Sequence, residues 1–199
     1  TASRNRLVPG NATFSARLLG LDPQDRETPD TVISWLLNQR LLGDPGQHAP
    51  ATVSDAGDGA HTVFLATHDG LLHSFDGDTG VERWAFIPRQ LLPRLPELMR
   101  DEESITRSHG IDGALALHRY DPDGDGHIDV SAGEHLWLIF GLGRGGSGYY
   151  ALDVASPDEP RLMWSLGSTD LGDDAESWPQ PDLERKFGSS AEFVGRRRG

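Results

Sequence analysis

The chain has 199 residues, 36% of them hydrophobic and 25% charged, which is enough for a core within one domain or part of a larger one. Its 31 acidic and 18 basic residues give a formal net charge of −13, which argues against nucleic acid as a partner and suits divalent cations. Without cysteine the chain has no disulfide or thiolate metal site, and no apolar run approaches the roughly 20 residues of a membrane-spanning helix.

The N-terminal part of the chain shows one clear element. Residues 1–29 are polar and rich in turn formers, so we expect an irregular segment. The stretch 30–43 has the pattern of a helix, because Asp30 can cap its start and Gly43 can end it. Its apolar residues fall roughly on one face: Val32, Trp35, Leu36 and Leu42. We expect residues 43–61 to form a loop.

The middle and C-terminal parts are rich in strand patterns. Three strands are expected at 62–67, 71–76 and 82–87, separated by turns that contain Asp and Gly, and such a meander is typical of a propeller blade or part of a barrel. A short helix should begin near Leu95. Further strands are expected at 110–120, 135–142, 149–154 and 161–166, followed by a loop or disordered tail at 182–199. The fold class is therefore mainly β, with short inserted helices.

Two stretches of the chain resemble each other. "SFDGDTGVERW" (74–84) and "ALDVASPDEPRLMW" (151–164) both contain a small residue, an Asp, a turn and a closing Trp. They resemble the tryptophan-docking repeat of quinoprotein-like propellers, in which the indole lies between neighbouring blades. Their separation exceeds the roughly 40–45 residues of an ordinary blade, so an insertion is implied. A closed propeller of seven blades needs roughly 280 residues, so we expect an incomplete, propeller-like fragment.

An acidic stretch, "DPDGDGHID" (121–129), follows part of the EF-hand pattern. Asp121, Asp123, Asp125 and Asp129 occupy positions 1, 3, 5 and 9 of that loop, Gly126 occupies position 6, and Ala132 stands where the last Glu is expected. We predict a calcium ion held by these four carboxylates and by the main-chain carbonyl of His127. Without the final Glu its affinity should be roughly micromolar or weaker. An acidic turn without an ion is the alternative.

Longer stretches resemble a known family. "VFLATHDGLLHSFDGDTGVERWAFIPRQLLPRL" (63–95), "GIDGALAL" (110–117) and "LWLIFGLGRGGSGYYALDVASPDEPRLMW" (136–164) are similar, in the same order, to the PilC-type β-propeller of type IV pilus tip-associated adhesins and pilus biogenesis proteins, the PilY family. The likeness covers about 30–181, which we take as one propeller-like domain. His68 and Ser74 depart from the usual Asn and Ala of that pattern.

The resemblance implies a function and a location. It implies a non-enzymatic, calcium-binding protein of type IV pilus biogenesis that influences pilus extension against retraction, twitching motility and surface attachment. Its partners would be pilus components such as minor pilins, and a host or surface ligand. It would lie outside the cytoplasm, at the pilus tip or cell surface, or in the periplasm during assembly. The family carries its calcium loop in the slot that 121–129 occupies here.

Other patterns in the sequence suggest different functions. "GLGRGG" (141–146) matches a dinucleotide-binding motif, but the following residues favour a strand over a helix, so we expect a glycine-rich turn. The histidines lack the spacing of zinc motifs, and no nucleophile motif is present. Two alternatives stay open: a fragment of a quinoprotein (PQQ-dependent) dehydrogenase, and an extracellular binding module whose calcium is purely structural.

Overall fold

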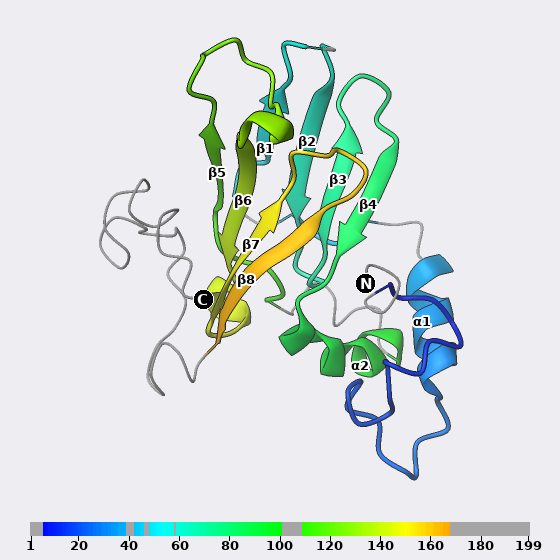
Figure 1. The fold of residues 1–199 in the computed structure, drawn as a ribbon. Coiled ribbons are helices and arrows are strands. Elements are labelled where there is room, and N and C mark those ends of the chain that lie inside the picture. Colours follow the sequence, from blue (N-terminus) through cyan, green and yellow to red (C-terminus); the bar gives the residue numbers. More distant parts are fainter. Residues whose placement is uncertain (1–5, 39–41, 46–47, 58, 101–108, 168–199) are drawn as a thin grey trace.

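The structure is a computed structural model that describes residues 6–38, 42–45, 48–57, 59–100 and 109–167. Its main feature is a pair of four-stranded antiparallel sheets, each a simple up-and-down meander (Figure 1). The first sheet contains β1 (Ala51–Ser54), β2 (His61–Ala66), β3 (Leu72–Asp76) and β4 (Glu82–Phe86). The second contains β5 (Leu115–Tyr120), β6 (His135–Gly141), β7 (Gly148–Asp153) and β8 (Arg161–Gly167). These are two blades of the expected propeller-like, mainly β fold.

The strand register confirms that the two Trp-bearing stretches are structural repeats. Ser74 on β3 lies opposite Trp84 on β4, and Ala151 on β7 lies opposite Trp164 on β8. In both blades the register shifts immediately after the small residue. The indole nitrogen of Trp84 donates a hydrogen bond of 2.8 Å to the carbonyl of Pro157, between β7 and β8. Trp84 therefore joins the two blades, as the docking repeat predicts.

The main core lies between the two sheets. Alternate residues of β2 point into it, since Phe64 and Ala66 are buried while Val63 and Leu65 are only partly so. β6 and β7 are buried along most of their length, which is why they appear in the sequence as almost continuous apolar runs. The buried members of this core are Phe64, Ala66, Leu72, Leu91, Ile111, Ile128, Leu136, Leu138, Phe140, Leu142, Tyr150, Leu152 and Val154.

A second apolar cluster lies where the helices pack. α1 (Pro29–Asn38) buries Val32 and Ile33, and it packs with the 3₁₀ helix η2 (Arg89–Arg94) and with α2 (Leu95–Arg100). The irregular N-terminal segment adds buried residues to this cluster: Phe14, Leu19 and Leu21. These helices lie at the end of the sheets opposite the β5–β6 loop (Figure 1). None of the described helices is long and apolar enough to cross a membrane.

Two expectations for the N-terminal half were wrong. Residues 43–61 are not loop throughout, because Ala51–Ser54 form β1, which pairs with His61–Phe64 of β2. Four residues are too few to show a periodicity, and the ladder to β2 supplies the strand's stability. Leu42 lies beyond the end of α1 and is 52% exposed, so it does not share the helix face. The expected tail at 182–199 lies outside the described residues.

Candidate metal centre

The predicted calcium loop connects β5 to β6, within the first hairpin of the second blade. Gly124 and Gly126 adopt positive φ angles of 71° and 81°, which only glycine accepts readily, so the loop depends on both. Asp121 accepts hydrogen bonds from both of these glycine amides, at 2.8 and 3.0 Å. Asp125 Oδ1 accepts the amide of His127 at 2.8 Å. The aspartates thus shape the backbone that brings them together.

The carboxylates that meet in this loop are not the four that the sequence suggested. One oxygen each from Asp121, Asp123 and Glu134 lies within 4.8 Å of the others. Asp125 and Asp129 do not belong to that group. Asp129 instead caps the short 3₁₀ helix η4 (Val130–Ala132), because its Oδ1 accepts hydrogen bonds from the amide and hydroxyl of Ser131 at 2.8 and 2.6 Å.

Glu134 is the site residue that the sequence pattern missed. It is only 4% exposed, and its Oε2 accepts the amide of Asp129 at 2.8 Å. It lies two residues beyond the EF-hand position for the last ligand, and η4 between Val130 and Ala132 turns the chain back so that Glu134 faces the loop. The available signal in the sequence was a further carboxylate, five residues after Asp129 and directly before the strand that begins at His135.

The charges of the loop favour ionised carboxylates. Burial raises the pKa of Asp121, but hydrogen bonds from the amides of Gly124 and Gly126, together with Asp123 and Arg119, lower that pKa overall. The hydroxyl and amide of Ser131 lower the pKa of Asp129. An all-oxygen set of carboxylates in one tight loop has the chemistry that a hard cation such as Ca²⁺ requires, so these residues fit the ion.

The loop is bonded to the other blade as well as to its own. His127 Nδ1 lies 2.8 Å from Asp55 Oδ1, and this contact raises the pKa of His127. The amide of Ala56 donates to the carbonyl of Gly126 at 3.0 Å. Arg119 donates to the same Gly126 carbonyl and also to that of Ser54, at 3.3 and 2.7 Å. The β5–β6 loop and the β1–β2 turn therefore form one bonded unit across the blade boundary.

Two repeated blades, joined by a docking tryptophan and by an acidic loop, define a piece of a β-propeller. The model of the PilY1 beta-propeller domain family matches residues 42–196. The chain therefore belongs to that family, and the resemblance seen in the sequence is confirmed.

Known proteins similar to this chain are pilus factors. A "Type IV pilus biogenesis factor PilY1 homolog" of Xylella fastidiosa (strain Temecula1 / ATCC 700964) is 36% identical over 110 residues, which is 55% of this chain and 8% of that protein. The "Type IV pilus biogenesis factor PilY1" of Pseudomonas aeruginosa (strain UCBPP-PA14) is 32% identical over 126 residues, 62% of this chain and 10% of that protein. The chain thus spans a tenth or less of these relatives.

A solved structure is also similar. The crystal structure of the Pseudomonas aeruginosa PilY1 C-terminal domain is 30% identical and has a TM-score of 0.42, with coverage of 61% of this chain and 22% of the other.

Proposed function

We propose that this chain is the calcium-binding part of a type IV pilus biogenesis factor, and that it has no enzymatic role. Membership of the PilY1 β-propeller family and the printed names of its relatives support the pilus assignment. The observation that carries the calcium assignment is the meeting of Asp121, Asp123 and Glu134 in a loop bonded to the neighbouring blade.

The donor set favours Ca²⁺ over other divalent ions. Ca²⁺ takes six to eight oxygens in flexible geometry, whereas Mg²⁺ demands a near-ideal octahedron and keeps several waters. Asp121, Asp123, Asp125, Asp129 and Glu134 would supply carboxylate oxygens, and His127 its main-chain carbonyl. Asp125 and Asp129 would become ligands when their carboxylates turn from the backbone amides whose hydrogen bonds they now accept toward the bound ion. Three mutually repelling carboxylates within 4.8 Å also gain from a counter-cation.

Calcium in this loop would act by ordering it. The bound ion would neutralise carboxylates that otherwise repel, and the loop would then hold one shape on the blade surface. A pilus partner such as a minor pilin, or a surface ligand, could recognise that shape. We propose that occupancy in this way influences pilus extension against retraction, twitching motility and attachment, in a protein located outside the cytoplasm at the pilus tip or cell surface.

Titration with Ca²⁺ and with luminescent Tb³⁺ tests the ion site. Asp125→Ala and Asp129→Ala should each weaken binding by about tenfold or more, because each removes a charged oxygen ligand. Asp78→Ala is the matched control, since Asp78 is an exposed aspartate of the β3–β4 turn that pairs with His61. Unchanged affinity in both loop variants would show that Asp125 and Asp129 are not ligands, and unchanged affinity in Asp123→Ala as well would show that the ion site has been assigned to the wrong loop.

A purely structural calcium is a second candidate, favoured by the bonds from the loop to Asp55 and Ala56 of the first blade. The two candidates differ in cells. Full-length protein carrying Asp129→Ala should alter the number of surface pili and the twitching zone if calcium is regulatory. Normal piliation, together with lost calcium binding in the purified protein, would instead support the structural candidate.

A further inference from the structure

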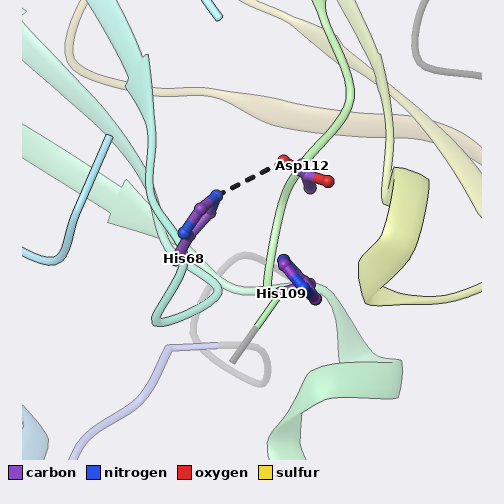
Figure 2. Close-up of side chains that lie close together, drawn as sticks. All are labelled: His68, His109 and Asp112. Carbon is purple, nitrogen blue, oxygen red and sulfur yellow. Dashed lines mark hydrogen bonds and ion pairs between the residues drawn. The ribbon is translucent and has the colours of Figure 1, made fainter. Parts of the chain in front are cut away.

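A second group of metal-binding side chains lies at the other end of the blades. One ligand atom each from His68, His109 and Asp112 lies within 4.8 Å of the others. Figure 2 shows the three side chains converging, with His68 on the turn after β2 and the other two on the segment that leads into β5. β5 runs from this segment to the β5–β6 loop, so the length of that strand separates the group from the calcium loop.

The backbone holds these segments together rigidly. The amide of Ile111 donates to the carbonyl of Thr67 at 3.2 Å, and a Cβ on Gly110 would overlap the amide nitrogen of Gly70. A Cβ on Gly145 would likewise overlap the carbonyl of Gly110. Such close approach is possible only because residues 110 and 145 are glycines and have no Cβ. Main-chain packing therefore brings the segments that carry the two imidazoles and the carboxylate together.

The glycine-rich stretch 141–146 completes this packing, and it lacks the helix that a dinucleotide-binding motif leads into. The 3₁₀ turn η5 (Gly143–Gly145) leads directly into strand β7, so no helix N-terminus follows the glycines. The sequence interpretation of a glycine-rich turn is confirmed. In addition, Arg144 of this turn donates from Nε and Nη2 to the two carboxylate oxygens of Asp112.

One polar atom of the group has no hydrogen-bond partner among the described residues. Nδ1 of His109 is buried, and no described residue is its hydrogen-bond partner. Nε2 of His68 pairs with Asp112 Oδ1 at 3.3 Å. Leaving a buried donor or acceptor unpaired is unfavourable, and a bound metal ion would remove that cost at His109. Asp112 is only 5% exposed, and although burial raises its pKa, Arg144 and His68 lower it overall, so the carboxylate is charged.

We propose that His68, His109 and Asp112 bind a divalent first-row transition metal ion, with Zn²⁺ as the preferred occupant. Two imidazoles and one carboxylate form a donor set suited to Zn²⁺ rather than to Ca²⁺, and three protein ligands leave one position open for water. Tetrahedral zinc with bonds of about 2.0–2.1 Å holds its ligands about 3.3 Å apart, so side-chain shifts of about 1 Å close the site.

Arg144 does not block this site. Its side chain is 59% exposed, so the guanidinium can stay on Asp112 Oδ2 or swing into solvent while Oδ1 takes the metal. A hydrogen bond to the second oxygen of a ligating carboxylate is the ordinary support for such a ligand. The positive charge nearby lowers the affinity but does not remove the site.

The test uses the full 199-residue chain, purified without a polyhistidine tag and saturated with Ca²⁺ so that the β5–β6 loop is occupied. Calorimetric titration with Zn²⁺ should show one binding site. H68N and H109Q should each lower its Zn²⁺ affinity by about 10–100-fold or more, because losing even a contact that supports a metal ligand has an effect of that size. Co²⁺ should give visible d–d absorption of a low-symmetry site in the parent, and much less in both variants.

Controls separate this site from other histidines. H61N changes an exposed histidine that pairs with Asp78, and H118Q changes one in a different cluster beside His135, so both should bind Zn²⁺ like the parent. Should H109Q fail to fold by circular dichroism, a folded H68N and the Co²⁺ spectrum of the parent decide. Equal Zn²⁺ binding by the parent and a folded H68N, or no Co²⁺ absorption in the parent, overturns the proposal.

Discussion

Glu134 is a buried carboxylate that needs a positive partner. It is 4% exposed, and among its described contacts it accepts one amide hydrogen bond, from Asp129, while lying beside Asp121 and Asp123. Burying a charge without a compensating opposite charge is costly, and like charges nearby increase that cost. A calcium ion would relieve both, and Glu134 would then act as the late acidic ligand that position 12 of the loop lacks.

Glu134→Gln should therefore weaken calcium binding by about tenfold or more while leaving the metal-free protein as stable as the parent or slightly more so. The amide oxygen of Gln can still accept the hydrogen bond from Asp129, and the substitution removes one of three repelling charges. Calcium titration and urea unfolding in a chelator measure the two effects. Glu159→Gln, an exposed change between β7 and β8, is the control.

An unaltered calcium affinity for Glu134→Gln would assign the ion to the aspartates alone. A large loss of stability in chelator would mean instead that Glu134 serves the fold, through its bond to Asp129. The two measurements together distinguish these roles.

At the scale of elements, the sequence predicts strands that have a clear hydrophobic pattern. It does not predict a very short strand or a ligand that a turn brings back to the loop. β2 alternates in burial and is bounded by turn residues, so its sequence predicts it. β1 has four residues and depends on its ladder to β2. In the loop, the spacing of aspartates predicts Asp121 and Asp123, whereas Glu134 is reached only through the turn of η4.

The histidine group could not be read from spacing at all. His68 and His109 belong to separate segments that meet through the backbone contact of Gly70 and Gly110. Motifs such as H-x-x-x-H detect ligands that lie on one helix, and they do not detect ligands that come from two separate segments. In the sequence, this contact is indicated only by the glycines of the two segments. A glycine permits close backbone approach, but it does not identify the segment that approaches.

The Trp84 contact is a prediction at the scale of the blade. Trp84→Phe should lower the free energy of unfolding by about 1–3 kcal/mol, because it keeps an aromatic ring near Phe64 but leaves the Pro157 carbonyl without its 2.8 Å hydrogen bond. Urea unfolding measures the loss. Trp35→Phe makes the same ring change in α1, away from the blade contact, and provides the comparison. If Trp84→Phe is as stable as the parent, Trp84 does not hold the blades together.

At the scale of the whole molecule, the two blades are linked near both ends of the sheets. At one end the β5–β6 loop bonds to Asp55 and Ala56, and at the other the segment at Gly110 packs against Gly70 (Figure 1). A ligand that orders one blade at such a link must also restrict the other, because their main chains share hydrogen bonds. Calcium binding should therefore reduce backbone motion beyond the loop that contains its ligands.

Hydrogen exchange with and without calcium measures this coupling. Amides of 121–134 should exchange more slowly with calcium, and so should those of 55–57 in the first blade, because the Ala56 amide donates to Gly126 in the loop. Helix α1, which packs in a separate apolar cluster, should be unchanged and serves as the internal control. Protection confined to 121–134 would contradict the coupling, and the blades would then respond to calcium independently. Protection in both places would make the ion a clamp between blades, as the proposed effect of calcium on a pilus partner requires.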